Sequence, residues 1–156
     1  MNYQLQKVRK TENGQLIFEA DQDFSVSQKY QILNIRDFCN ECGNCTTFCP
    51  SSGSPYKDKP GICLSLDTFK QEEKGYYLSR LPDRTILIYK EEGKIKTLSQ
   101  ENDKYFYESD EVKATINPAD FKIEEVDFLD KETNEADFNF AAEMSVVLKG
   151  LYQIFI

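Results

Sequence analysis

Four of the five cysteines in this sequence are crowded into eleven residues, and they are the residues best suited to chemistry. They form the run Cys39-x2-Cys42-x2-Cys45-x3-Cys49, with Pro50 directly after the last cysteine. Three thiolates at three-residue spacing let one loop curl around a compact cluster and aim its sulfurs inward. Four thiolates also match the four irons of a [4Fe–4S] cluster. The spacing therefore predicts one [4Fe–4S] cluster bound by Cys39, Cys42, Cys45 and Cys49.

Two other fates of these cysteines are weighed against the cluster. A zinc site with four cysteine ligands usually takes two C-x2-C pairs that are well separated in sequence, and here the cysteines are crowded together. Disulfides are disfavoured in the cytoplasm, where we expect the protein to lie. Both alternatives therefore rank below an iron–sulfur cluster.

The identity of the fourth ligand stays open. In bacterial ferredoxins with two clusters, the cysteine before the proline ligates the other cluster. Five cysteines cannot supply the eight thiolates of two [4Fe–4S] clusters, so either Cys49 or Cys63 completes a single cluster. We favour Cys49, which leaves Cys63 as an ordinary buried thiol. A ligand from a partner chain is the third alternative.

Histidine is absent from the sequence, and this absence excludes several kinds of chemistry. Ser–His and Cys–His catalytic pairs, His-ligated zinc or haem, and Rieske centres all require histidine. The seven glycines form no phosphate-binding loop. We therefore expect an electron-transfer module that is not catalytic by itself. The alternatives are a structural module holding zinc or a redox-silent cluster and, less favoured, a hydratase-like enzyme with an open iron.

The segment Asp37–Lys59 resembles the C-terminal iron–sulfur region of the selenate reductase subunit family. Members of that family are large bacterial proteins with a flavoprotein part related to the small subunit of glutamate synthase. The resemblance rests on CNECGNC, on FCP and on the run Gly53–Lys59, and continues weakly to about residue 100. It implies a redox complex with a flavoprotein and a molybdenum-containing partner. The first cysteine motif of the family is missing around Gln6–Gly14, as is the flavin-binding part, so a separate subunit and the tail of a longer protein are both open.

Charge is distributed unevenly along the chain. Residues 101–137 hold 13 acidic residues and 4 lysines, a net charge of −9, whereas the whole chain carries −8. No basic stripe is available for nucleic acid, which needs one to neutralise phosphates. The acidic stretch is either a solubilising, partly disordered loop or a docking surface for a partner with a basic face. The segment Lys57–Lys59 is a second candidate docking patch, or simply a solvated loop. We expect no membrane span and a cytoplasmic location.

Hydrophobic patterning predicts an α+β fold. It would consist of a small ferredoxin-like iron–sulfur region at residues 1–65, then a region at residues 66–156 with a short antiparallel β-meander, the acidic stretch and a C-terminal helix. We expect the helix to dock on its own core, with partner binding as the alternative. The predicted strands are 15–19, 30–35, Tyr76–Leu81, Thr85–Lys90 and Lys94–Leu98, with short helical turns at Leu66–Glu73 and a strand at Val112–Ile116 inside an otherwise loop-like acidic stretch.

Overall fold

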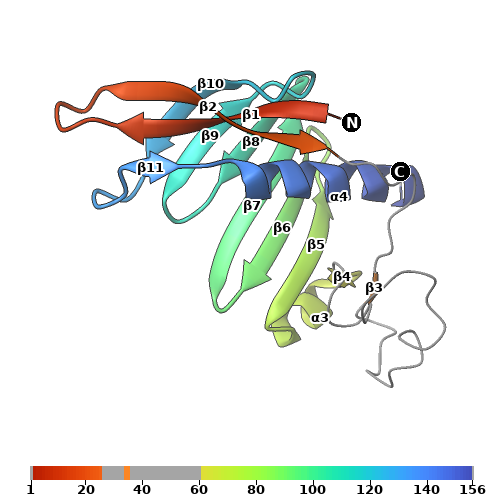
Figure 1. The fold of residues 1–156 in the computed structure, drawn as a ribbon. Helices are drawn as coiled ribbons and strands as arrows, with labels where there is room; N and C mark the ends of the chain where they lie inside the picture. The colour runs from red at the N-terminus through yellow and green to blue at the C-terminus, as the bar shows by residue number, and fades with distance from the viewer. Residues whose placement is uncertain (1, 26–33, 36–60, 156) are drawn as a thin grey trace, which may run out of the picture.

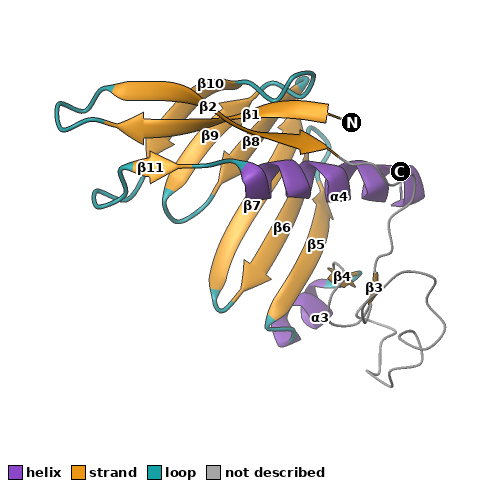
Figure 2. Ribbon diagram, viewed as in Figure 1, coloured by secondary structure: helices purple, strands orange, loops and turns teal. Residues whose placement is uncertain are grey.

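The computed structural model describes residues 2–25, 34–35 and 61–155, with the backbone alone at 34–35 and 153–155. Strands dominate this part of the chain and form two sheets, accompanied by two helices, α3 and α4 (Figure 2). The predicted α+β class with a ferredoxin-like region is therefore wrong. The described residues form a mainly β protein without a ferredoxin-like fold. The cysteine spacing predicts a metal site, and this does not determine the fold, because the same kind of site can be carried by unrelated folds.

The larger sheet contains eight strands in the spatial order β10-β9-β8-β7-β6-β5-β4-β3. Neighbours from β5 to β10 pair antiparallel, whereas β4 pairs in parallel with both β3 and β5. The strands are β3 (Asn34–Ile35), β4 (Gly61–Cys63), β5 (Lys74–Arg80), β6 (Thr85–Glu91), β7 (Lys94–Glu101), β8 (Lys104–Glu108), β9 (Val112–Ile116) and β10 (Ile123–Phe128).

Tight turns join the central strands of this sheet. Glu92 and Gly93 between β6 and β7 both have positive φ (52° and 77°), as do Asn102 and Asp103 between β7 and β8 (49° and 60°). Two consecutive residues of positive φ make a type I′ turn, whose twist matches that of the flanking strands. The three predicted strands of the meander are confirmed as β5, β6 and β7.

The two faces of the larger sheet differ in burial. Leu87 and Tyr89 of β6 are buried, whereas Ile86 and Ile88 on the opposite face are only partly buried. This alternation matches the pattern expected from the sequence, because successive side chains of a strand point to opposite faces. The buried face is the one that carries the second layer of the molecule.

That second layer consists of a three-stranded sheet and the long helix (Figure 1). The sheet has the order β11-β1-β2, with β1 (Asn2–Lys10), β2 (Leu16–Ser25) and β11 (Glu135–Ala136). The helix α4 (Asn139–Phe155) crosses the larger sheet and fully buries Met144, Leu148 and Leu151. Docking of this helix on its own core is confirmed. Neither helix of the described part is long and apolar enough to cross a membrane.

Aromatic side chains join the two layers. Phe121, at the turn between β9 and β10, is completely buried and stacks on Tyr3 of β1 with ring centroids 5.0 Å apart. Its φ of 60° is unusual for a bulky residue, and such strain persists only where surrounding contacts hold it. Tyr107 of β8 meets Phe138, next to α4, edge to face at 6.0 Å. The hydrophobic core is thus continuous between the layers.

The acidic stretch is more regular than the sequence suggested. Residues 101–137 include β8, β9, β10 and β11, so the predicted loop, and with it the partly disordered alternative, is wrong. The strand predicted at Val112–Ile116 is confirmed as β9. The division of the chain at residue 65 stays a prediction, although the core contains Leu5 and Val8 together with residues of β5–β10 and α4.

Candidate functional site

The predicted ligands Cys39, Cys42, Cys45 and Cys49 lie outside the described residues, as does the candidate docking patch Lys57–Lys59. The structure does describe the strands on either side of the cysteine segment. Ile35, at the end of β3, pairs with Ile62 of β4, and Asn34 pairs with Gly61. These two residue pairs bring the described residues on either side of the cysteine segment together in one parallel ladder at an edge of the larger sheet.

Cys63 is the one cysteine within the described residues. It lies in β4, between β3 and β5, and is 2% exposed. Its register partner is Tyr77 of β5, so its side chain shares the face of the sheet that carries Tyr77. A Cβ placed on Gly75 would lie 3.4 Å from the Cys63 Sγ, which means that a larger side chain at position 75 would crowd the thiol. The thiol is thus packed within the parallel part of the larger sheet that β3 and β4 form, which we call the corner.

The short helix α3 (Leu66–Gln71) covers this corner, and it confirms the helical turns predicted there. The Ser65 hydroxyl accepts a hydrogen bond from the Thr68 N–H at 3.1 Å and caps the start of the helix. At its end, the Lys90 ammonium donates to the carbonyl oxygens of Phe69 and Lys70. Cations favour the carbonyl end of a helix, so Lys90 of β6 ties α3 to the meander.

Aromatic contacts complete the corner. The Phe69 ring lies 5.7 Å from the Tyr77 ring, and the Lys90 ammonium lies 4.7 Å from the centre of the Phe69 ring. Phe69 is the buried side chain of α3, whereas Leu64 and Leu66 on either side of Ser65 are exposed. The corner next to the cysteine segment is therefore supported by one helix, one cation and one aromatic pair.

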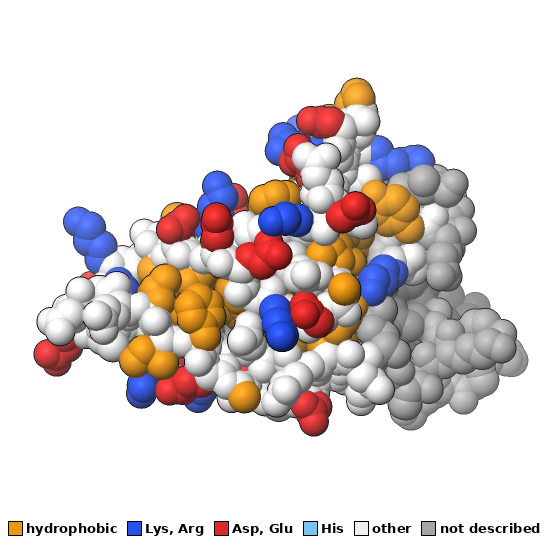
Figure 3. All heavy atoms as spheres, turned by 90° about the horizontal axis from the view of Figure 1, so that it is seen from above, with side chains coloured by type: hydrophobic (Ala, Val, Ile, Leu, Met, Phe, Trp, Pro, Cys, Tyr) orange, Lys and Arg blue, Asp and Glu red, His pale blue; other side chains and the backbone are white. Residues whose placement is uncertain are grey.

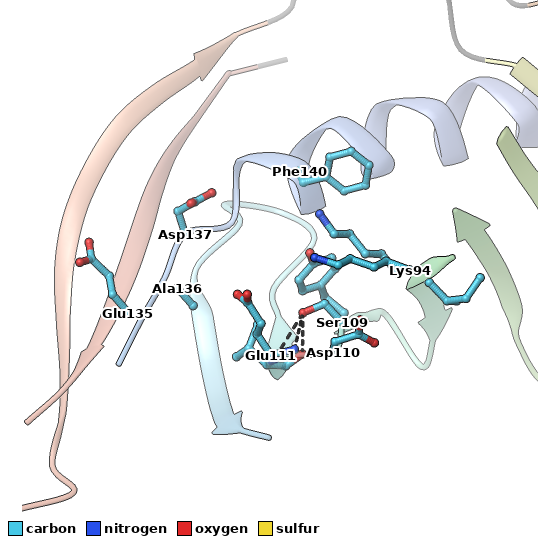
Figure 4. Close-up of a pocket in the computed structure, with 12 residues that line it drawn as sticks. Lys94, Ser109, Asp110, Glu111, Glu135, Ala136, Asp137 and Phe140 are labelled. Carbon is cyan, nitrogen blue, oxygen red and sulfur yellow. Dashed lines mark hydrogen bonds between the residues drawn. The ribbon is translucent and has the colours of Figure 1, made fainter. Parts of the chain in front are cut away.

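A second site candidate is a hollow of about 220 Å³ at the start of α4 (Figure 4). Lys94 and Lys96 of β7 line it together with Phe140 of α4, and the Lys96 ammonium lies 4.2 Å from the centre of the Phe140 ring. The remaining charged side chains of the lining are carboxylates, contributed by Asp110, Glu111, Glu135 and Asp137. The hollow thus combines charges of both signs.

Sequence reasoning did not find this hollow, because its residues come from three separate parts of the chain. Its one aliphatic hydroxyl, on Ser109, is held within its own turn, where it accepts from the N–H groups of Glu111 and Val112 at 3.3 Å each. The same hydroxyl donates to the Val112 carbonyl oxygen at 3.4 Å, so its hydrogen bonds serve the turn.

Tyrosines and carboxylates meet beside this hollow, under α4. The Tyr89 hydroxyl donates to the Glu91 carboxylate at 2.6 Å, and its ring contacts Tyr76 and Phe140 at 4.8 and 4.7 Å. Burial, followed by the bond to Glu91, raises the pKa of Tyr89, and the same bond lowers the pKa of Glu91. Burial also raises the pKa of Glu143 on α4, an effect that Lys96 partly opposes. Tyr89 therefore stays protonated and acts as a hydrogen-bond donor.

Within residues 2–25 and 61–155, no group of three or more Cys, Asp or Glu side chains is placed to hold a metal ion. The ligands predicted from the sequence lie outside these residues, in the cysteine segment. Four thiolates crowded into eleven residues are a donor set that fits an iron–sulfur cluster.

Comparisons with known proteins add one partial match. A stretch of 31 residues, 20% of this chain, is 58% identical to an Escherichia coli (strain K12) protein described as "Putative oxidoreductase YgfK". The protein of the same description from Escherichia coli O157:H7 matches equally. The match spans 3% of the length of these relatives. No family model and no solved structure matches the chain. One fifth of this chain is therefore similar in sequence to a protein described as a "Putative oxidoreductase".

Proposed function

We propose that this chain is the electron-transfer part of a larger cytoplasmic oxidoreductase, related to the selenate reductase subunit family. It binds one [4Fe–4S] cluster through Cys39, Cys42, Cys45 and Cys49, and the cluster supplies a one-electron carrier. The single observation that carries this proposal is the spacing of these cysteines. The similarity to an oxidoreductase supports it, because the relative carries that description.

The sheet edge has a definite role in this proposal. Ile35 and Ile62, which lie on either side of the cysteine segment, pair in one ladder at the edge of the larger sheet, and this supports a cluster mounted beside that edge. Electron transfer needs a cofactor at a constant distance from its partner, and a segment anchored to a sheet meets this need better than a free tail. The β-rich body thus serves as a mount for the cluster.

The buried position of Cys63 supports Cys49 as the fourth ligand. Cys63 is packed against the Gly75 backbone on the face that carries Tyr77 and α3. To bind iron there, the cluster would have to lie inside this packed corner. Cys49 belongs to the same run as the other three cysteines and needs no such rearrangement.

The partners in this proposal are a flavoprotein and a molybdenum-containing oxidoreductase subunit. The acidic side chains of residues 101–137 lie mainly at exposed positions, and their net charge of −9 suits a partner with a basic surface. Electron transfer from a reduced flavoprotein should slow as salt rises. Neutralising Asp127, Asp130 and Glu132 together should slow it similarly at low salt. Rates that are flat in both tests would remove the acidic face from the mechanism.

The test of the cluster itself is spectroscopic. Protein prepared without oxygen should be brown, should contain about four irons per chain as a [4Fe–4S] cluster does, and should bleach with dithionite. Cys42→Ser should lower the iron content sharply and weaken the visible absorbance. A colourless protein that contains zinc instead would establish the structural metal module, and a Cys42→Ser variant with full iron would overturn the ligand assignment.

A further inference from the structure

The strand β2 offers an open edge that the proposed function does not use. It ends the order β11-β1-β2, and its hairpin with β1 projects beyond the larger sheet (Figure 1). None of its ten side chains is fully buried, whereas β1 buries Tyr3, Leu5 and Val8. Among the described residues, no strand pairs with the outer side of β2. Exposed edges of this kind are templates for pairing with another chain.

The hydrogen bonds of the hairpin show which groups face outward. The Thr11 N–H donates to the Gln15 carbonyl oxygen at 2.9 Å, and the register continues with Arg9 opposite Ile17. In an antiparallel ladder, alternate residues point their N–H and C=O groups to the same neighbour. Residues 15, 17 and 19 therefore bond to β1, whereas Leu16, Phe18 and Ala20 direct their backbone groups away from it.

The regular part of this edge is short and centred on Phe18. It begins after the Thr11–Gln15 turn. It ends at a bulge, because Ala20 pairs with Gln6 while Asp23 pairs with Gln4, so two residues of β2 oppose one residue of β1. A bulge bends the strand and interrupts further pairing. The segment available to a partner is thus 16–20.

The side chains of this segment favour contact. Leu16 is 38% exposed and Phe18 is 44% exposed, and both lie on the same face of β2 as Ala20. Hydrophobic side chains gather at this end of the molecule in the view from above (Figure 3). The one acid of the segment, Glu19, is neutralised by Arg9 at 3.0 Å, with Lys7 at 3.9 Å.

The free edge of the larger sheet is different. The strand β10 carries Glu124, Glu125 and Asp127 among its six residues, and all three are exposed. Charged side chains on an edge discourage pairing. In addition, the Gln6 side chain accepts from the Ile123 N–H at 2.9 Å, so the start of β10 is already occupied. Of these two edges, β2 is the one open to a partner.

We propose that β2 pairs antiparallel with β2 of a second copy of this chain, around a two-fold axis at Phe18. In this register Phe18 faces Phe18 of the other copy, and Leu16 faces Ala20. Each outward N–H and C=O of the segment then finds a partner. On the other face Ile17 lies opposite Glu19, so no two acids of the segment face each other. The segment is self-complementary, which is what an isologous dimer requires.

The experiment is sedimentation equilibrium of the full chain under reducing conditions, up to about 1 mM, because a small interface makes a weak dimer. Wild type should form dimers within this range. Phe18→Lys should weaken dimerisation at least about tenfold, because it places two ammonium groups opposite each other. The matched control is Ile95→Lys, since Ile95 of β7 is 39% exposed and lies away from this edge.

A second variant acts through the backbone alone. Ala20→Pro removes an outward N–H that no bond to β1 uses, so it should weaken the dimer while far-UV circular dichroism stays unchanged. A chain that stays monomeric throughout would overturn the proposal, as would a monomer that captures an unrelated extended peptide on β2. A dimer that survives both β2 variants, or that Ile95→Lys dissociates equally, would overturn it as well.

Discussion

The antiparallel meander under α4 and the parallel corner formed by β3 and β4 are stabilised in different ways. Strands β6 and β7 pair along seven residues, and Leu87 and Leu98 on their inner face are fully buried. The corner has a strand of two residues and one of three, joined by two register pairs. Much of its support comes from single contacts such as the one between Lys90 and α3. The meander is therefore stabilised by long ladders and buried leucines, whereas the corner has short ladders and few pairs among the described residues.

Leu148→Ala should have the largest effect, because it opens a cavity where α4 packs on the meander. The side chain is completely buried, and such a substitution costs about 3 kcal/mol of the free energy of unfolding. Urea denaturation followed by circular dichroism measures this loss. The control is Leu81→Ala in the exposed β5–β6 turn, which should cost less than about 0.5 kcal/mol. Equal losses in the two variants would contradict the central role of the α4 contact.

Two cysteine variants, Cys49→Ala and Cys63→Ala, test the cluster and the corner while leaving the meander unchanged. Cys49→Ala should lose the [4Fe–4S] signal in electron paramagnetic resonance of the reduced protein, or leave a three-iron form, because a ligand is gone. Cys63→Ala should keep the cluster and lose about 1 kcal/mol of stability through the small cavity it creates. The opposite outcome would make Cys63 the fourth ligand.

Hydrogen exchange of the same variants sharpens this comparison. Metal binding to a segment contributes folding free energy to that segment. Loss of the cluster should therefore speed the exchange of Ile62 and Tyr76 amides in β4 and β5 while leaving Leu87 and Leu98 protected. If exchange rises equally in the meander, the two regions form one cooperative unit.

The smallest expected effect concerns Glu143 on α4 and is a matter of pH. Burial raises the pKa of this carboxyl, so the folded state holds the proton more tightly than the unfolded state. The stability that this proton contributes is complete below the ordinary carboxyl pKa and is lost as the pH rises through the folded pKa. Glu143→Gln should therefore melt slightly higher than wild type at neutral pH and equally in acid. Glu12→Gln in the exposed β1–β2 turn is the control, and a shift of the same size there would remove the argument.

Sequence patterns succeeded where a local signal was strong. The alternation of Ile86–Tyr89 predicted a strand with two different faces, and the apolar spacing of Met144, Leu148 and Leu151 predicted the docked helix. The turn at Glu92 and Gly93 lies between two predicted strands. In these places each local preference agrees with the final packing.

Sequence patterns failed where acidic residues obscured the alternation of buried and exposed side chains. Residues 101–137 looked like a loop because of their carboxylates, yet Tyr105 and Tyr107 alternate on β8 and Ala114 and Ile116 on β9, all facing inward. The pair Asn102-Asp103 was a turn signal that could have revealed the β7–β8 hairpin. The buried side chains of β1 do not keep a two-residue period, because Val8 follows Leu5 by three positions, so no strand was expected there.

The candidate site was predictable only as a motif. The spacing of Cys39–Cys49 names the ligands, and it stays a prediction because these residues lie outside the described part of the chain. The ladder that pairs Ile35 with Ile62 joins residues on both sides of the cysteine segment, and no local pattern reveals such pairing. The hollow at α4 was missed for the same reason.

The contact between Lys149 of α4 and Tyr3 of β1 has a consequence for the order of folding. Its atoms lie 2.7 Å apart, although 146 positions separate the two residues. Hairpins with two-residue turns form from neighbouring residues and need little loop closure, so the meander can assemble early. Tyr3 obtains this contact only after α4 has been synthesised. During translation, the core around β1 therefore stays incomplete until α4 packs, and its apolar side chains are exposed to chaperones or to other chains.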